Sequence, residues 1–215
     1  MAVRELLRGE VPQEQLNRIA VEVAGRYGQE AESITVMDAD NWLSTPCVVN
    51  EEWFVKVITA QNSFVHALLT TGRNLGALTS RSSGIFEHFG TPLGMAEHEL
   101  EATRRIRELG VNAPEPLEAF EFEGYGVLVF EYLPDFASLD DLDGDALDWA
   151  VPALFETLST LHSAGIVHGD LRAENVLVVD EDLFFIDATK VKEDAVDEAR
   201  AYDLACALEI GRAHV

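Results

Sequence analysis

A short polar segment in the second half of the chain carries a carboxylate and a carboxamide at a fixed spacing. Asp170 is followed five residues later by Asn175 in the stretch His168-Gly169-Asp170-Leu171-Arg172-Ala173-Glu174-Asn175. A further carboxylate, Asp187, comes twelve residues after Asn175. Transfer of a phosphoryl group needs a carboxylate that orients the attacking hydroxyl, and oxygen ligands for Mg²⁺. Asp170 fits the first role, while Asn175 and Asp187 fit the second.

The competing interpretation of this segment is a polar turn between strands, in which Asp170 only caps a helix. Apolar residues flank the loop on both sides, with Ile166-Val167 before it and Val176-Leu177-Val178 after it. The combination of two apolar flanks with the correctly spaced Asp187 favours a phosphoryl-transfer loop over a simple turn.

Lys56 is a second candidate for contact with phosphate. It lies inside the apolar run 53–58, and the chain has only three lysines: Lys56, Lys190 and Lys192. A lysine in such a strand is suited to reach the α and β phosphates of a nucleotide while a helix carboxylate holds it. The alternative is a solvated lysine on an edge strand. In combination with the loop at 168–175, the pattern favours a catalytic and nucleotide-binding role for Lys56.

The carboxylate partner of Lys56 is expected on a helix predicted over residues 94–109. This helix offers three glutamates, which are Glu97, Glu99 and Glu101. Glu99 lies three and seven residues before Ala102 and Ile106, which mark the buried face. The other two glutamates share the charged face, so the spacing favours Glu99. The alternative is that Glu99 pairs with a surface arginine.

The segment Phe130-Glu131-Tyr132-Leu133-Pro134 ends a predicted strand and is a candidate for adenine binding. Backbone groups from Glu131 to Leu133 are expected to bind the edge of the base, and Phe130 to back the pocket. The alternative is an ordinary strand end.

The remaining pattern predicts the elements that must position these residues. Helices are predicted over 12–27, over 94–109, and over the stretch with apolar residues at 151, 154, 158 and 161 that ends at Gly165. Strands are predicted over 33–37, 47–49, 53–58, 117–123, 125–132, 176–179 and 183–186. Residues 60–94 are predicted to form an insert with a short helix near 62–70, and 134–148 an acidic connector. This order predicts an α+β fold with a small antiparallel-sheet lobe, one long helix and a mainly helical large lobe.

Charge is the strongest compositional signal. Asp and Glu total 39 against 15 Lys and Arg, so the formal net charge is −24. An acidic surface of this kind suits concentrated salt, where screening shortens electrostatic reach to about 3 Å at 1 M. We therefore infer a salt-accumulating, halophilic archaeal source, and an acidic partner-binding face is the alternative. The composition argues against direct nucleic-acid binding through a basic patch.

The sequence also predicts where in the cell the protein is located. No apolar run reaches the roughly 18–20 residues of a bilayer-spanning helix, and the N-terminus has no apolar signal core. Cys47 and Cys206 are far apart and predict neither a disulfide nor a metal site. We expect a cytoplasmic protein without membrane contact.

Over about residues 33–208 the chain resembles the protein-kinase-like superfamily, and within it the RIO family of atypical kinases. Three features favour that family: Gly169 inside the His-Gly-Asp loop, Asp187-Ala188-Thr189 in place of Asp-Phe-Gly, and a long insert between Lys56 and Glu99. The resemblance implies ATP and Mg²⁺ as cofactors and matches the site residues Lys56, Glu99, Asp170, Asn175 and Asp187 to the family's motifs. It further implies serine/threonine kinase or ATPase activity, and a pre-ribosomal particle or another protein as partner, because family members act in small ribosomal subunit maturation.

The chain departs from the kinase pattern between its first two predicted strands. Residues 38–47 contain no glycine, whereas the usual loop uses glycines to bring backbone amides to the phosphates. The hydroxyls of Ser44 and Thr45 are candidates to replace those amides, while Pro46 lacks a donor. Loss of Phe and Gly after Asp187 implies no ordinary in/out switch of that segment.

The predicted domain organisation follows from these assignments. It comprises an N-terminal helical extension over 1–32, a small lobe over 33–133 with its insert at 60–94, a truncated large lobe over 134–208, and a non-native tail over 209–215. The tail reads like a translated sequencing-library adapter, which predicts that the gene was truncated.

Two other functional classes stay open. A small-molecule phosphotransferase of the aminoglycoside or choline kinase type also uses a His-Gly-Asp loop and a later Asn. A nucleotide-binding scaffold without catalysis is favoured by the glycine-free loop. Another near relative is the small archaeal kinase that works with the tRNA threonylcarbamoyladenosine machinery, although the basic patches of that kinase are not evident here.

Overall fold

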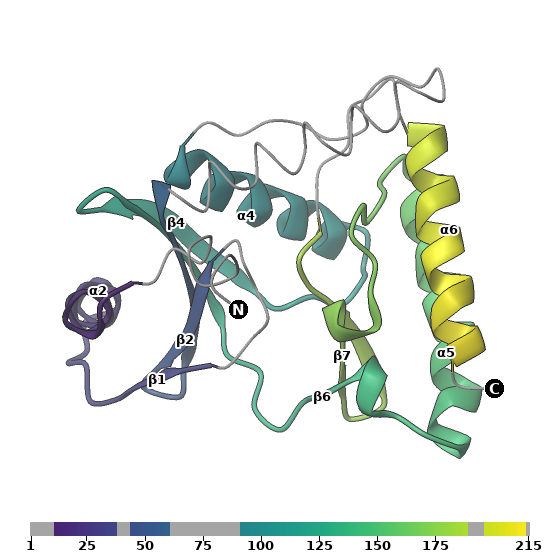
Figure 1. Cartoon of the computed structure of the whole chain (residues 1–215), viewed down its shortest axis with the longest axis horizontal. Helices are drawn as coiled ribbons and strands as arrows, with labels where there is room; N and C mark the ends of the chain where they lie inside the picture. The colour runs from purple at the N-terminus through teal and green to yellow at the C-terminus, as the bar shows by residue number, and fades with distance from the viewer. Residues whose placement is uncertain (1–10, 38–43, 61–90, 189–195, 214–215) are drawn as a thin grey trace, which may run out of the picture. The chain divides into compact units, whose positions relative to one another are not determined.

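The computed structural model describes residues 11–37, 44–60, 91–188 and 196–213 (Figure 1). These residues form two compact units. The first contains the described residues 11–37, 44–60, 91–100 and 115–134, and the second contains 101–114, 135–188 and 196–213. Each unit has its own buried apolar cluster.

The first unit is built on a five-stranded antiparallel sheet. Its strands are β1 (Ile34–Val36), β2 (Thr45–Val49), β3 (Trp53–Ile58), β4 (Pro116–Phe122) and β5 (Tyr125–Glu131), in the order β1-β2-β3-β5-β4. The turn between β4 and β5 consists of Glu123 and Gly124, both with positive φ, 51° and 84°. Two residues with positive φ form the turn whose twist matches the flanking strands of a hairpin, so this turn fixes the register of β4 against β5.

Helices cover both faces of this sheet. Alternate residues of β3 point to opposite sides, so Trp53, Val55 and Val57 join one apolar cluster and Ile58 joins another. The first cluster packs under α2 (Gln13–Arg26), which buries Leu16, Ile19 and Val23. Burial of each such side chain contributes roughly 1.5–3 kcal/mol. The second cluster packs under the start of α4 (Pro92–Glu108), which contributes Ala96 and Leu100.

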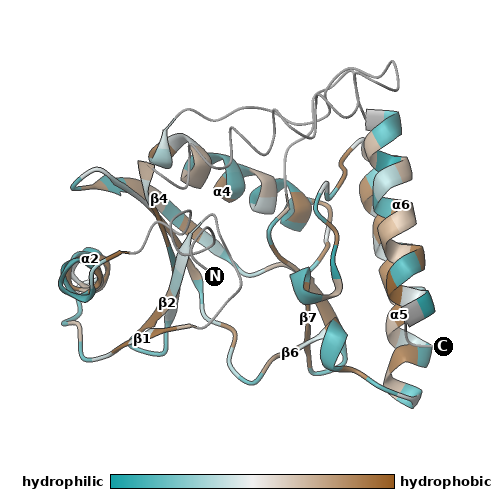
Figure 2. Ribbon diagram, in the orientation of Figure 1, coloured by the Kyte–Doolittle hydropathy of each residue, from teal (hydrophilic) through white to brown (hydrophobic). Residues whose placement is uncertain are grey.

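The second unit combines a three-stranded sheet with two long helices. Its elements are β6 (Ala137–Ser138), η1 (Leu139–Asp141), α5 (Asp145–Ser163), η2 (Ala173–Asn175), β7 (Val176–Val179), β8 (Asp182–Phe185) and α6 (Val196–Ala213). The sheet order is β6-β7-β8. Figure 2 shows brown, apolar stretches along α5, and its Leu154, Leu158 and Leu161 are fully buried beside Ala207 of α6.

The predicted α+β fold is confirmed, and most elements lie where the sequence placed them. β3 and β7 have the predicted bounds. α4 begins at Pro92, so the prediction that 92–93 belong to the insert is wrong, because proline is well tolerated in the first turn of a helix. The short helix predicted near 62–70 lies outside the described residues, as does most of the insert.

The acidic connector predicted over 134–148 ends earlier than expected and includes regular secondary structure. It contains β6 and η1, and α5 already begins at Asp145. Leu139 is fully buried there, and the carboxylate of Asp141 accepts hydrogen bonds from the backbone and hydroxyl of Ser138. These bonds lower the pKa of Asp141. Burial of Leu139 and the hydrogen bonds between Asp141 and Ser138 therefore order a segment whose acidic composition is typical of solvent-exposed chain.

Three further features bear on the sequence predictions. Residues 209–213 continue α6, and Ile210 is 7% exposed within the apolar cluster of the second unit. Cys47 and Cys206 form no disulfide in the described part of the chain, and burial raises the pKa of the Cys47 thiol to about 12. Within the described ranges, no helix has the length and hydrophobicity that crossing a bilayer requires.

Candidate active site

Lys56 lies on the face of β3 that α4 covers. It sits between Pro46 of β2 and Leu128 of β5 in the sheet register, and only 4% of the residue is exposed. Its Nζ lies 2.5 Å from Oε1 of Glu99. A buried ammonium needs a charged partner to offset the loss of hydration, so this ion pair accounts for a lysine in an otherwise apolar strand.

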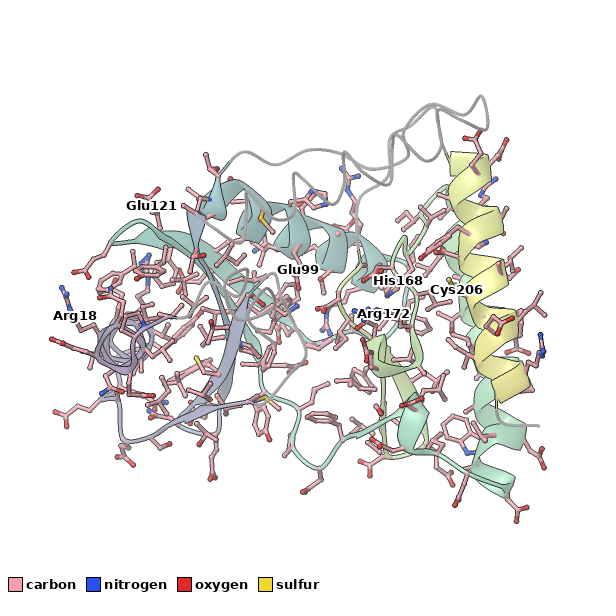
Figure 3. All side chains as sticks on the ribbon, in the orientation of Figure 1. Arg18, Glu99, Glu121, His168, Arg172 and Cys206 are labelled. Carbon is pink, nitrogen blue, oxygen red and sulfur yellow. The ribbon has the colours of Figure 1, made fainter. Side chains whose placement is uncertain are left out.

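Of the three candidate glutamates, Glu99 is the one that forms the ion pair with Lys56 described above. Its side chain is 20% exposed, whereas the side chain of Glu101 is 56% exposed and bonds to Arg105 one turn along α4. Figure 3 marks Glu99 on α4. The helix-face argument therefore predicted the pairing of Lys56 with Glu99 correctly, while their roles toward a nucleotide stay predictions.

In the second unit, the backbone at the start of the 168–175 loop is held by Asp203 of α6. Its Oδ2 accepts the backbone N–H of His168 at 2.8 Å, and its Oδ1 accepts that of Gly169 at 2.9 Å. Oδ2 also lies 3.0 Å from Nε2 of His162 on α5. Asp203 is fully buried. A charged acceptor that satisfies two buried backbone donors fixes the path of the loop directly before Asp170.

His168 links this loop to the segment that carries Asp187. The side chain is fully buried, and its Nε2 lies 3.0 Å from the backbone oxygen of Ile186. Burial lowers the pKa of His168, although the negative charges of Asp203, Asp170 and Asp187 act in the opposite direction. The ring is therefore neutral near pH 7, and its Nε2–H donates to Ile186.

Asn175 is oriented by the same loop. Its Nδ2 donates to the backbone oxygen of Asp170 at 2.8 Å, and its own backbone oxygen accepts the N–H of Ile186 at 3.0 Å. Because the amide nitrogen is occupied, the side-chain oxygen is the atom that Asn175 presents for a cation. Asn175 is only 3% exposed, so this orientation is fixed by its surroundings.

The donor set fits Mg²⁺. Asn175 and Asp187, the residues predicted to hold the ion, have the hard oxygen atoms that would suit it, and Mg²⁺ in nucleotide sites is bound by one or two protein oxygens together with phosphate oxygens and water. Asp187 has a positive φ of 60°, which is uncommon for a residue with a side chain. No group of three or more His, Cys, Asp or Glu in the described part of the chain is placed to hold a metal ion.

Asp170 has a positively charged neighbour that the sequence analysis did not consider. Nη2 of Arg172 lies 3.4 Å from Oδ2 of Asp170, and Nη1 contacts Glu174. Figure 3 labels Arg172 on this loop. The Arg172 side chain is 53% exposed, so a guanidinium in contact with water lies beside the carboxylate predicted to orient the acceptor.

The predicted adenine segment lies at the end of β5. The N–H of Glu131 donates to the backbone oxygen of Glu115 at 3.0 Å, and the N–H of Tyr132 donates to that of Glu52 at 2.9 Å. These two donors are therefore engaged within the unit. Of the three backbone N–H groups in the predicted adenine segment, that of Leu133 is therefore the remaining candidate to donate to the base.

Thr45 is the first residue of β2, and Ser44 directly precedes it. Thr45 pairs with Val57 in the sheet. Ser44 is 8% exposed, and no described residue forms a hydrogen bond with its Oγ. Residues 38–43 of the predicted phosphate loop lie outside the described residues, so the structure places only the last part of that loop.

Asp203, which holds the backbone of the candidate loop, was not predicted from the sequence. The sequence held one signal for it, because Asp203 falls among Ala199, Ala207 and Ile210, which form the buried face of α6. A carboxylate on an apolar helix face is seldom buried unless it is paired. The sequence offered no way to identify its partners, which lie 34 and 35 residues away on another element.

Comparison with known proteins gives a consistent picture. The sequence model of the RIO domain family matches residues 92–202, which is more than half of the chain. The chain is 31% identical over 110 residues to KEOPS complex subunit Bud32 of Pyrococcus abyssi, covering 49% of either protein. It is 29% identical over 108 residues to a probable bifunctional tRNA threonylcarbamoyladenosine biosynthesis protein of Thermoplasma acidophilum, covering 50% of this chain and 20% of the relative. The chain thus spans about half the length of one curated relative and a fifth of the other.

Solved structures share the fold at low sequence identity. The Rio2 kinase of Chaetomium thermophilum, solved as an ADP/Mg²⁺-phosphoaspartate complex, aligns with a TM-score of 0.59 at 16% identity, covering 92% of this chain and 60% of that one. Monomeric WbdD aligns with a TM-score of 0.50 at 17% identity, covering 85% of this chain and 42% of that one.

Proposed function

The chain belongs to the family of RIO-domain proteins, and from this premise we propose that it is an ATP- and Mg²⁺-dependent phosphotransferase, acting as a serine/threonine kinase or as an ATPase. The observation that carries the proposal is the construction of the 168–175 loop. Buried hydrogen bonds fix its backbone at His168 and Gly169 and orient the amide of Asn175. Fixed polar groups of this kind stabilise a transition state without rearranging first.

Each candidate residue has one role in the proposed reaction. Asp170 orients the acceptor hydroxyl and takes its proton as the hydroxyl oxygen attacks the γ-phosphorus. The bond between that phosphorus and the leaving oxygen of ADP breaks in the same transfer. Lys56, held by Glu99, binds the α and β phosphates. Asn175 and Asp187 would hold Mg²⁺, which neutralises charge on the phosphates when bound.

The nucleotide is proposed to be held by residues at three further places. Ser44 and Thr45 would contact phosphate through their hydroxyls, and the buried Oγ of Ser44 supports a polar ligand at this point. Glu131 and Leu133 would bind the adenine edge through backbone groups. The phosphate contacts can be tested separately from the adenine contacts. Ser44→Ala should weaken binding of ATP more than binding of adenosine, because adenosine has no phosphate.

The ATPase form differs only in the acceptor. Water replaces the hydroxyl, so the products are ADP and inorganic phosphate. The similar Rio2 structure is a phosphoaspartate complex, which favours a path in which an aspartate oxygen of this chain first takes the γ-phosphoryl group and water then cleaves the acyl phosphate. A mass increase of the chain that hydroxylamine reverses would support that path.

Two partner assignments are open within this function. The family resemblance points to a pre-ribosomal particle. One curated relative is instead named as a KEOPS complex subunit, and the other as a probable bifunctional tRNA threonylcarbamoyladenosine biosynthesis protein. The second assignment is the one that a 31% identity favours. ATP turnover measured with purified KEOPS subunits and with small-subunit precursors would separate them, since only the true partner should change the rate.

Two further proposals concern the setting of the enzyme. A net charge of −24 supports a cytoplasm with high salt. The lobes are proposed to be 33–133 and 134–208, after an extension over 1–32.

The proposed activity is tested by release of phosphate from ATP and by its transfer to protein, in about 2 M KCl, a salt concentration at which repulsion is screened. Lys56→Ala and Asp187→Ala should each lose most of the turnover. Retention of the full rate by both variants would reject the assignments. Nucleotide binding without any turnover in the unaltered protein would favour the scaffold alternative.

A further inference from the structure

The first turn of α4 lies very close to β5 at Gly126. A Cβ atom at this position would lie 2.2 Å from the backbone oxygen of Pro92 and 2.9 Å from the nitrogen of Leu93. Both are backbone atoms, so a side chain at position 126 fits only if α4 and β5 move apart. Gly126 is not among the described glycines with positive φ. Position 126 therefore requires glycine because α4 and β5 approach closely there. The backbone conformation of this residue does not require it.

The same helix and sheet carry the Lys56–Glu99 ion pair. In the sheet register Gly126 lies opposite Ile58, and Leu128, two residues further along β5, lies opposite Lys56. Between Pro92 and Glu99, the fully buried Ala96 packs in one cluster with Ile58 and Leu128. Along α4 there are therefore three contacts with the sheet. The first turn packs against Gly126, Ala96 packs one turn later, and Glu99 then forms the ion pair with Lys56. Two small residues bring the helix close enough for Glu99 to reach Lys56.

We propose that Gly126 is a positioning residue that sets the separation between Lys56 and Glu99. An α-helix moves as a nearly rigid rod, and Glu99 is seven residues, about 10 Å, along it from Pro92. Displacement of the first turn from β5 therefore displaces Glu99 from β3. The catalytic consequence rests on the proposed function, because a displaced Glu99 no longer holds the lysine that binds phosphate. The structural part does not, because the ion pair is a contact between two side chains of the protein itself.

The scarcity of lysine makes the structural part directly measurable. The chain has three lysines, so NMR of protein labelled at the lysine side chain gives few signals, and Lys56→Arg identifies that of Lys56. Gly126→Ala should move the Lys56 signal away from its position in the unaltered protein. Gly25→Ala is the matched control, because a Cβ at Gly25 meets nothing within 4 Å, and it should leave the signal in place. A folded Gly126→Ala variant with an unmoved Lys56 signal would overturn the proposal.

A kinetic cycle separates positioning from general destabilisation. At a temperature where all variants are folded, Gly126→Ala should lower ATP turnover by about 100-fold, the loss typical of a misplacement near 1 Å. In a Glu99→Gln background the same substitution should have little further effect. Effects that multiply in the double variant would show that Gly126 acts elsewhere and would contradict the proposal. If the unaltered protein turns over no ATP, the proposed function fails, while the NMR result still decides the role of Gly126.

A second variant covers the case in which Gly126→Ala does not fold. Ala96→Val adds two carbon atoms between the same helix and the same two strands at a fully buried position. It should move the Lys56 signal in the same way. An unmoved signal in folded Ala96→Val would overturn the proposal.

Discussion

Lys56 in the first unit forms a side-chain ion pair with Glu99, whereas the loop at 168–175 in the second unit is held through its backbone by several buried hydrogen bonds. The ion pair joins a strand to a helix, so its length depends on how close that helix packs. The loop is fixed by Asp203, which bonds to two consecutive N–H groups, and by His168, which bonds to Ile186. The first arrangement can be adjusted by a small helix movement, and the second cannot be adjusted without breaking buried bonds.

The difference assigns different tasks to the two units. Groups that must meet developing charge are best fixed before the reaction, and this suits Asp170 and Asn175. A phosphate-holding lysine whose partner sits on a separate helix allows binding to be tuned by that helix. Substitutions in the second unit should therefore cost folding stability and activity together, whereas substitutions in the first should mainly affect nucleotide binding and turnover.

The largest effect is expected for Asp203→Asn. A carboxamide keeps one acceptor oxygen, so at least one of the two N–H groups of His168 and Gly169 loses its partner. Each buried donor left unpaired costs about 1–3 kcal/mol, and turnover should fall with the free energy of unfolding. Denaturant titration and an ATPase assay measure both. Asp197→Asn on the same helix is the control, since its side chain is 95% exposed; equal losses in the two variants would refute the bracing role of Asp203.

The next largest effect is expected for Lys56→Met. Loss of one fixed charge at a phosphate should lower turnover by about 100-fold or more, while the fold is retained. Glu99→Gln should have a smaller effect in the same direction, because the lysine remains but loses its charged partner. Glu101→Gln is the control, since Glu101 pairs with Arg105 on the exposed side of α4. A Glu101→Gln enzyme as impaired as Glu99→Gln would contradict the assignment.

A change of intermediate size is expected in the free energy of unfolding when the pH is lowered. Burial lowers the pKa of His168 in the folded protein below its ordinary value of about 6.5. The unfolded chain therefore binds a proton first as the pH falls. The stability that the neutral ring contributes is complete above pH 6.5 and is lost below it, by up to about 1.4 kcal/mol per pH unit.

Denaturant titrations between pH 7.5 and 5 measure this slope. His168→Gln should remove its share of the pH dependence. An unchanged slope in His168→Gln would show that His168 is not held neutral in the fold.

The smallest effect is expected for Arg172→Gln. Its contacts with Asp170 and Glu174 are exposed to water, so the free energy of unfolding should change by less than about 1 kcal/mol. Turnover should fall by up to about tenfold, because the cation beside Asp170 is lost. Arg105→Gln removes an arginine whose side chain is also 53% exposed and should leave turnover unchanged. A stability loss as large as that of Asp203→Asn would contradict the difference between the two kinds of contact.

The sequence predicted what depends on local periodicity. The apolar run around Lys56 placed β3, and the helix face of Ala102 and Ile106 identified Glu99, because strand and helix spacing are properties of a few consecutive residues. It did not predict the partners of Asp203 or the close approach at Gly126. Both depend on packing between segments distant in the chain, which residue spacing does not encode. β6 was missed because a two-residue strand leaves no alternation to detect.

Titration with ADP and Mg²⁺, followed through the Lys56 NMR signal, tests the proposed function most directly, since the proposal is that Lys56 binds the phosphates of a nucleotide whose Mg²⁺ Asp187 helps to hold. In the unaltered protein the signal should move on addition of the nucleotide with Mg²⁺. In Asp187→Asn the same addition should move it only at a much higher nucleotide concentration. A Lys56 signal that does not respond, or that responds equally in both proteins, would contradict the account.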